Sequence, residues 1–224
     1  MGVIILIKNK VLTSLFCVFT IFLIITFSIA LPIYVRPFYY AHIDAYNLEE
    51  VTGMNKEQIK EGYNEVLDYL TLPNKEFGAG DFKFSQEGKS HFEDCKFLFD
   101  LNASVLIVSF LGVVILYILH KKKVFTLSRP FGRHVSFTGG SITLFLFALI
   151  GGICAIDFDT AFVVFHKIFF YGKDNWVFDY QTDQIISALP QEFFLNCGIL
   201  IVSSIITISI CLLLYGIFSK PKNK

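Results

Sequence analysis

The chain has 224 residues, of which 54% are hydrophobic, 17% aromatic and only 17% charged, and its formal net charge is zero. This composition is too apolar for an ordinary soluble domain. The neutral total conceals a strong segregation of charge along the chain.

Four stretches are long and apolar enough to cross a bilayer, which takes about 20 residues of helix. They are residues 11–35, 101–119, 135–156 and 193–218, and none of them contains a charged residue. The absence of intramembrane charge argues against an ion pump or a proton relay through the bilayer. The first stretch is much longer than the 7–15 apolar residues of a signal peptide, so we expect an uncut anchor.

The charges divide the chain into two kinds of segment. Residues 1–10, 120–134 and 219–224 carry ten basic residues and no acidic one, whereas residues 36–100 and 157–192 carry all 19 acidic residues. Short loops rich in Lys and Arg stay in the cytoplasm. We therefore expect an all-α membrane protein with four transmembrane helices and both termini in the cytoplasm. Residues 120–134 form its cytoplasmic loop, and residues 36–100 and 157–192 form an extracellular cap.

The first cap segment contains a predicted amphipathic helix. Asn55 and Gln58 are placed as an N-cap and its reciprocal partner, apolar residues recur at helical spacing, and Pro73 ends the pattern. We expect a helix over residues 56–71, with its apolar face on the membrane surface or on the other cap segment. Residues 77–85 are expected to form a short strand or an extended arm.

Ser90 and Glu93 form the pattern of a capping box before an apolar run. The pattern predicts a helix that starts at Ser90, continues into the second span and has His91 as its first residue. The positive end of the helix dipole would keep the His91 ring neutral, whereas Asp94 would favour the charged ring or orient it. We also expect backbone amides near Ser90 to be available to stabilise an oxyanion.

Residues 161–171 are densely aromatic but too short to span a membrane, and Trp176 follows them. Aromatic side chains favour the membrane interface, so we expect an interfacial or re-entrant segment. His166 lies in its middle, at a depth similar to that of His91. An ionisable side chain in such an apolar setting is a candidate functional residue.

The other residues with reactive side chains suggest less. His42 lies in a cap region with little pattern, and His120 and His134 flank the basic loop as expected of headgroup contacts. The five cysteines show no spacing typical of disulfides or zinc sites, although a bridge between Cys154 and Cys197 is conceivable. Nucleophile-elbow and phosphate-loop motifs are absent from the sequence.

The cap segments resemble the bacterial lipoprotein intramolecular transacylases. Residues 88–96, which include His91-Phe92-Glu93-Asp94, resemble the first motif of that family, and residues 157–194 resemble its second motif. The residues that carry the second resemblance include Phe165-His166-Lys167, Asn175-Trp176-Val177 and Leu189-Pro190-Gln191. The likeness extends over essentially the whole chain, and four spans with an extracellular cap also agree with it.

The resemblance implies an acyltransferase of the cell membrane. It would move the sn-2 acyl chain of an S-diacylglyceryl cysteine to the amine of the same cysteine and so produce a lyso-form lipoprotein, without a cofactor. The resemblance makes His91 and His166 the catalytic residues, and we expect Asp94, Phe165 and Trp176 to contact the substrate. The expected partners are a bacterial diacylated lipoprotein and membrane lipid, and no nucleic acid.

Two other functions fit the same residues. A membrane hydrolase or metalloenzyme would use both histidines with water, although no ligand spacing around them indicates a metal. A non-enzymatic membrane module would bind a partner through the cap, with His91 as a solvated helix-start residue and His166 as an interfacial one.

Overall fold

The computed structural model describes residues 2–219, and side chains from residue 8 onward. Its α-helices are α1 (Gly2–Tyr34), α2 (Arg36–Ala45), α3 (Leu48–Thr52), α4 (Lys56–Thr71), α5 (Gln86–Lys121), α6 (Val135–Ile156), α7 (Phe158–Phe169) and α8 (Gln191–Phe218). Two short 3₁₀ helices are η1 (Pro130–Gly132) and η2 (Gln184–Ala188). The three lysines of the predicted C-terminal tail, Lys220, Lys222 and Lys224, lie outside the described residues.

Among residues 2–219, four helices are long and apolar enough to cross a membrane, which confirms the prediction of a four-span all-α membrane protein. They are Lys8–Tyr34 within α1, together with the whole of α5, α6 and α8. Helix α5 has 36 residues and is therefore about 54 Å long, whereas the hydrocarbon core is only about 30 Å thick. The charged residues 86–100 of α5 thus extend beyond its apolar stretch.

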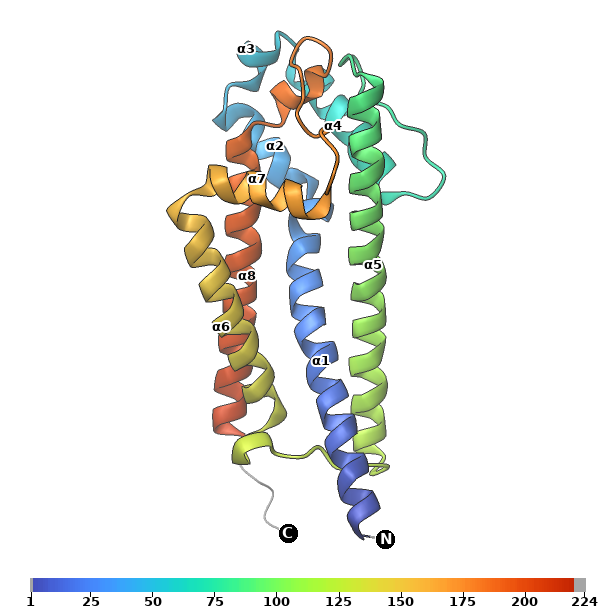
Figure 1. Cartoon of the computed structure of the whole chain (residues 1–224), viewed down its shortest axis with the longest axis vertical. Coiled ribbons are helices and arrows are strands. Elements are labelled where there is room, and N and C mark those ends of the chain that lie inside the picture. The colour runs from blue at the N-terminus through green and yellow to red at the C-terminus, as the bar shows by residue number, and fades with distance from the viewer. Residues whose placement is uncertain (1, 220–224) are drawn as a thin grey trace. The chain divides into compact units, whose positions relative to one another are not determined.

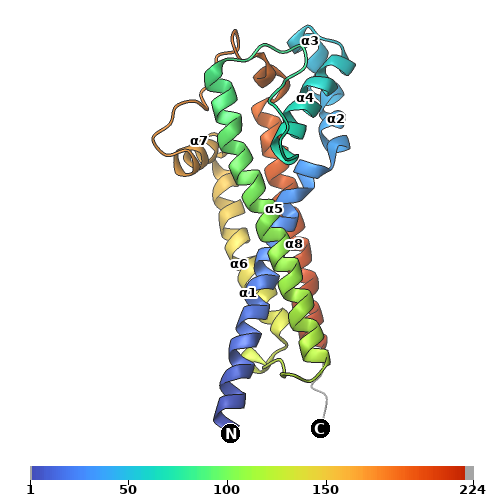
Figure 2. The ribbon, with the colours of Figure 1, turned by 90° about the vertical axis from the view of Figure 1, so that its right-hand side faces the viewer.

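The chain divides into two compact units, the bundle unit and the histidine unit. The bundle unit comprises Met1–Ile29, Ala103–Gly152 and Ile201–Lys224, and the histidine unit comprises Ala30–Asn102 and Ile153–Leu200. Segments of α1, α5, α6 and α8 run side by side in the bundle unit (Figures 1 and 2).

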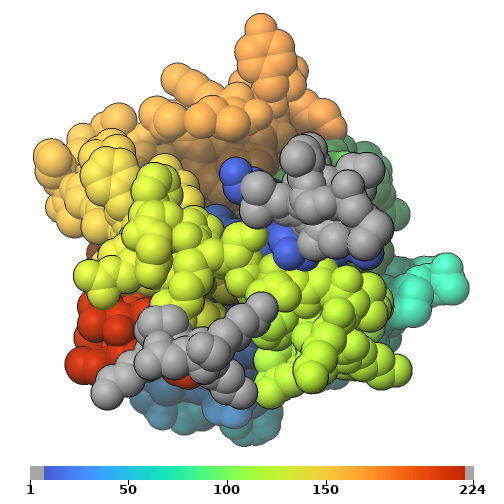
Figure 3. All heavy atoms as spheres, turned by 90° about the horizontal axis from the view of Figure 1, so that it is seen from below, coloured from blue at the N-terminus to red at the C-terminus, as the bar shows by residue number. Residues whose placement is uncertain are grey.

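Glycines bring α6 and α8 close together in the bundle unit. A Cβ atom on Gly140 would lie 2.7 Å from the backbone oxygen of Ser209, and one on Gly216 would lie 2.5 Å from the backbone nitrogen of Phe137. Small residues permit such approaches between helices in lipid. The connection between α5 and α6, yellow-green in Figure 3, is tied to α1 because Ser128 N donates to Thr13 Oγ1 at 2.8 Å.

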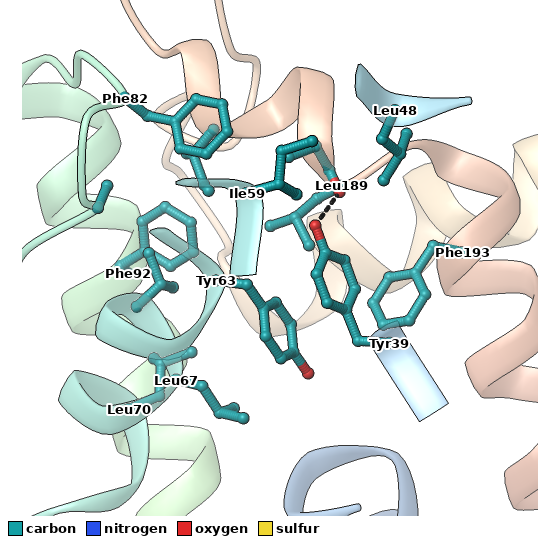
Figure 4. Packing of buried hydrophobic residues seen from close by; sticks show 14 of the residues in the cluster. Tyr39, Leu48, Ile59, Tyr63, Leu67, Leu70, Phe82, Phe92, Leu189 and Phe193 are labelled. Atoms are coloured by element: carbon teal, nitrogen blue, oxygen red, sulfur yellow. Dashed lines mark hydrogen bonds between the residues drawn. The ribbon is translucent and has the colours of Figure 1, made fainter. Parts of the chain in front are cut away.

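The histidine unit has its own hydrophobic core, made by α2, α3, α4 and η2 together with Phe92 of α5 and Phe193 of α8. Tyr39 and Tyr63 stack with ring centroids 3.7 Å apart, and the Tyr39 hydroxyl donates to the Ala188 carbonyl at 2.8 Å (Figure 4). Helix α4 has the predicted bounds and the predicted Asn55–Gln58 capping box. Its apolar residues lie in this core, so its apolar face packs on the other cap segment.

The structure differs from the sequence prediction at the start of α5 and decides the form of residues 77–85. Helix α5 begins at Gln86, so the predicted start at Ser90 is wrong, and His91 lies in the second helical turn. The Ser90 amide is therefore inside the helix, where N–H groups bond the carbonyl four residues earlier, and it does not offer a free donor. Residues 77–85 form an irregular arm rather than a strand.

Candidate active site

The residues just before the first family-like segment contact the second one in the histidine unit. Gln184 N donates to the Lys83 carbonyl at 3.0 Å, and Lys83 N donates to Gln184 Oε1 at 3.1 Å. Beside this pairing, Oδ1 of Asp183 accepts hydrogen bonds from Ser85 N at 2.8 Å and from Ser85 Oγ at 2.9 Å. These contacts join the start of α5 to the segment that follows α7.

The same contacts explain why α5 starts where it does. The Ser85 hydroxyl accepts a hydrogen bond from Gly88 N at 2.9 Å, as an N-cap residue does. Asp183 is only 4% exposed and places its negative charge at the helix N-terminus, where the dipole favours it. A Cβ atom on Gly88 would lie 2.0 Å from Oδ1 of Asp183. Glycine at position 88 thus permits the carboxylate to reach the helix start.

His166 is held by α7, which begins at Asp157. The Asp157 carboxylate accepts from Thr160 N at 3.0 Å and from Thr160 Oγ1 at 2.7 Å, which caps the helix. One turn before His166, the Phe162 carbonyl lies 2.7 Å from its Nδ1. Since a carbonyl only accepts, Nδ1 carries the hydrogen and donates it, and Nε2 of the neutral ring carries the lone pair. Helix α7 runs across the direction of α8 (Figure 1).

The structure brings the rings of His91 and His166 together. Their centroids are 5.9 Å apart with 26° between the ring planes, and the two residues are 5% and 8% exposed. Aromatic rings surround the pair. Phe170 lies 4.8 Å from His91 and 5.6 Å from His166, and Phe178 lies 5.3 Å from His91. The two imidazoles therefore share one predominantly apolar enclosure.

Two of the predicted substrate-contact residues flank His166. The Trp176 ring centroid is 4.9 Å from that of His166, and Phe165, which is 46% exposed, is 5.5 Å away. The indole N–H of Trp176 donates to the Lys173 carbonyl at 3.0 Å, which fixes the ring within its loop. Both aromatic side chains are thus placed beside the histidine pair.

Asp94 holds this loop and does not orient a histidine. Its carboxylate accepts from the Lys173 ammonium and, at 3.0 Å, from Asn175 Nδ2. Asn175 Nδ2 also lies 3.4 Å from Ser90 Oγ. The bonds from Lys173 and Asn175 outweigh the effect of burial, which raises the pKa of Asp94, so the net pKa lies below its usual value.

His91 contacts a residue that sequence reasoning missed. Cys95 lies one turn later on α5, with its Sγ 3.4 Å from Nε2 of His91. Nδ1 of the same ring is buried and has no hydrogen-bond partner among residues 2–219. Residues four apart on a helix share a face, so the His91–Cys95 spacing was a signal available in the sequence.

Both histidines are kept neutral by their surroundings. Burial, followed by the nearby His166, lowers the pKa of His91 from its ordinary value to about 4. Burial also lowers the pKa of His166, against the opposing effect of the Phe162 carbonyl. Two neutral imidazoles at pH 7 can accept or relay protons.

The remaining candidates have structural partners. In His42, Nδ1 donates to the Phe38 carbonyl at 2.6 Å and Nε2 lies 3.0 Å from Nδ2 of Asn196. Cys154 and Cys197 are both free thiols, so the conceivable bridge between them is not formed. Among the described residues, no group of three or more His, Cys, Asp or Glu side chains is arranged to hold a metal ion.

Comparisons with known proteins found a family and solved structures that are similar to this chain. Residues 14–194 match the model of the lipoprotein intramolecular transacylase Lit family. The chain is similar to a solved in meso structure of the membrane integral transacylase Lit from Bacillus cereus, with 27% identity, a TM-score of 0.83, and coverage of 93% of this chain and 94% of that one.

Two further structures of the Bacillus cereus protein, each with one histidine replaced, are also similar. The arginine variant is 25% identical and the alanine variant 26%, and each has a TM-score of 0.77 and covers 94% of this chain. The match covers 91% of the arginine variant and 94% of the alanine variant. No curated protein sequence matches the chain.

Proposed function

Because the chain belongs to the lipoprotein intramolecular transacylase family, we propose that it moves the sn-2 acyl chain of an S-diacylglyceryl cysteine to the amine of that cysteine, with His91 and His166 as its catalytic residues. The observation that carries the proposal is the pair of neutral, buried imidazoles whose ring centroids lie 5.9 Å apart. The enzyme is an acyltransferase, and its family acts on lipoproteins.

The proposed reaction breaks one ester bond and makes one amide bond. The amine nitrogen attacks the ester carbonyl carbon, the bond from that carbon to the glycerol oxygen breaks, and one proton passes from nitrogen to the glycerol oxygen. An α-amino group has a pKa of about 7.7–8.0, so a weak base is enough to take this proton. The amine and the ester belong to one molecule, so holding them in contact supplies much of the rate acceleration.

The loop and the aromatic residues beside the pair would position this substrate. We assign Phe165 and Trp176 to contacts with the lipid part of the substrate, because both flank His166 and nearly half of the Phe165 surface is exposed. Asp94 would act by anchoring the loop through Lys173 and Asn175. The substrate would be a bacterial diacylated lipoprotein in the cell membrane, surrounded by membrane lipid.

The proposal also includes the orientation of the chain. Both termini and residues 120–134 would lie in the cytoplasm, and the histidine pair would face the extracellular side. We propose this orientation because all 19 acidic residues lie in residues 36–100 and 157–192, whereas the other loops and tails are basic.

The test uses the fact that this reaction is an isomerisation. Incubation of the purified protein with a diacylglyceryl lipopeptide should leave the intact mass unchanged while the free amine disappears, as measured by mass spectrometry and by an amine-specific reagent. A hydrolase would lower the mass and leave the amine free, and that result would refute the proposed function.

Variants of the pair test the catalytic assignment. His91→Ala, His166→Ala and the double variant should each lose activity by a similar factor of about 10³ or more, because residues that act as a unit are strongly non-additive. His120→Ala, a histidine of the bundle unit, serves as the control and should retain activity. Near wild-type conversion by either single variant, or losses that simply multiply in the double variant, would contradict a shared step.

Treatment with EDTA tests the metalloenzyme alternative. We expect the purified enzyme to retain its activity in excess EDTA, because the proposed reaction uses only the two imidazoles and no metal ion. Loss of activity that is restored by zinc would favour a metal-dependent reaction instead.

A further inference from the structure

The contact between Cys95 and His91 bears on how the first histidine is used. Sγ of Cys95 lies 3.4 Å from Nε2 of His91, within the range of a hydrogen bond to sulfur, and Cys95 also packs against the core of the histidine unit. Either the thiol donates to the Nε2 lone pair, or an Nε2 hydrogen is donated to sulfur. The two cases give opposite tautomers of His91.

The state of the thiol distinguishes the two cases. Burial, with a smaller contribution from Asp94, raises the pKa of the Cys95 thiol to about 12, so the thiol keeps its hydrogen at neutral pH. A thiol is a weak donor as well as a weak acceptor, but when it donates it meets the imidazole lone pair, which is a good acceptor. In the opposite case the N–H would meet a neutral sulfur, which is a poor acceptor, and the thiolate, which would accept strongly, is disfavoured here. The thiol is therefore the donor and Nε2 of His91 is the acceptor.

The tautomer follows from this direction. When Nε2 of a neutral imidazole carries the lone pair, Nδ1 carries the hydrogen. Nδ1 of His91 is buried and has no partner among the described residues, and a buried donor without an acceptor is costly. Its hydrogen is free to bond an oxygen brought in by the substrate.

We propose that Cys95 is a positioning residue that fixes His91 as a hydrogen-bond donor to the carbonyl oxygen of the substrate ester. This inference rests on the proposed function, and it adds a residue and an assignment of roles that the histidine pair alone does not give. It also supplies an oxyanion donor in place of the Ser90 amide, which lies inside α5.

The two rings then have complementary roles. His166 donates its Nδ1 hydrogen to Phe162 and presents the Nε2 lone pair, so it takes the proton from the attacking amine. The carbonyl oxygen becomes an oxyanion that accepts from Nδ1 of His91. When the bond from carbon to glycerol oxygen breaks, His166 returns the same proton to that oxygen, and both rings end in their starting states.

The experiment combines tautomer measurement with kinetics on the full-length protein in detergent. Long-range ¹H–¹⁵N spectra of ¹⁵N-histidine-labelled protein, assigned by comparison with His91→Gln, report which nitrogen of His91 carries the hydrogen. We expect the hydrogen on Nδ1 in the wild type and in Cys95→Ser, whose hydroxyl also donates, and a shift of the population towards the other tautomer in Cys95→Ala.

The catalytic rates of the Cys95 variants should change in parallel with the tautomer populations of His91. Cys95→Ala should lower kcat about tenfold with little change in KM, the loss expected from one ordinary hydrogen bond, while Cys95→Ser restores most of it. Cys154→Ala, which removes another free cysteine of the same unit, should leave the rate and the melting temperature unchanged.

Three outcomes would overturn the inference. They are a wild-type spectrum with the hydrogen on Nε2, full activity in Cys95→Ala, and equal losses in Cys95→Ala and Cys95→Ser. Failure of the wild-type protein to isomerise the lipopeptide would instead reject the proposed function, and the spectra would still show whether Cys95 sets the tautomer.

Discussion

Burying two neutral imidazoles makes the stability of this protein depend on pH. Burial, with the neighbouring His166, lowers the pKa of His91 from 6.5 to about 4, and burial also lowers the pKa of His166. A group whose pKa is lower in the folded state stabilises the fold fully above its unfolded pKa, and this stabilisation is lost as the pH falls through the folded pKa. The sensitive window therefore lies between about pH 6.5 and pH 4.

We expect the melting temperature of the detergent-solubilised protein to fall as the pH is lowered from 7.5 to 4.5. In His91→Gln the fall should be smaller, because the unfolded state of that variant no longer gains a proton at position 91. Differential scanning fluorimetry at matched ionic strength measures the melting temperatures of the wild type and of His91→Gln at each pH. Parallel pH curves for the two proteins would show that His91 is not buried in its neutral form.

Residues of the site differ in how far the sequence reveals them. The sequence indicated His91 and His166 because both lie near predicted membrane boundaries, and the geometry unites them. Cys95 was detectable in principle, four residues after His91 on one helix face. Asp183 lay in the segment that carried the second resemblance, but its role at the start of α5 was not indicated, because its hydrogen bonds to Ser85 join positions 98 residues apart.

The starts of helices α4 and α5 show when a local capping pattern is enough to predict where a helix begins. Helix α4 starts at its capping box, because the Asn55 side chain accepts from Gln58 N at 3.0 Å and Asn55 N donates to Oε1 of Gln58 at 3.0 Å. The Ser90–Glu93 pattern has the same form, but Ser85 caps the helix five residues earlier with support from Asp183. A contact between distant segments thus overrode a local preference that sequence reasoning had used.

Replacing Gly88 by a larger residue should destabilise the start of α5. In Gly88→Ala the new Cβ would meet Oδ1 of Asp183 at 2.0 Å, and Asp183 cannot move without losing its bonds to Ser85. We expect destabilisation by about 1–3 kcal/mol, as for other overpacked sites, and reduced acyl transfer because His91 follows on the same helix. Thermal melting and the lipopeptide assay measure the two effects.

Gly152→Ala is the matched control for this prediction. Gly152 is also helical, but a Cβ atom there meets nothing within 4 Å. Replacing a helical glycine by alanine is favourable by roughly 0.5–1 kcal/mol, so the control should melt at the same temperature or slightly higher. Equal losses in both variants would mean that the Asp183 contact does not decide the effect.

For the whole molecule, composition and charge predicted the four spans, because apolar length and excluded charge are properties of each stretch alone. The compact histidine unit was less predictable. Its core joins residues as distant in the sequence as Tyr39 and Ala188, which are 149 positions apart. Contacts between such distant positions cannot be predicted from the local pattern of a single sequence. The resemblance of residues 88–96 and 157–194 to two family motifs suggested that these segments lie together, but it did not predict which residues contact each other.

The orientation of the whole chain in the membrane gives the last prediction. All 19 acidic residues lie in residues 36–100 and 157–192, and residues 120–134 carry five basic residues and no acidic one. Basic loops are retained in the cytoplasm, so the two acidic segments should face outward. Glu57, whose side chain is 81% exposed, and Lys122, which is also exposed, are suitable positions for cysteine substitution on the two sides.

On intact cells an impermeant thiol reagent should label Glu57→Cys and not Lys122→Cys, whereas both should react after the cells are disrupted. The wild-type protein gives the background labelling of the five native cysteines. Protection of Glu57→Cys on intact cells, together with labelling of Lys122→Cys, would invert the topology and place the histidine pair on the cytoplasmic side. Because the proposed substrate is a lipoprotein presented at the outer face, that result would also contradict the proposed site of reaction.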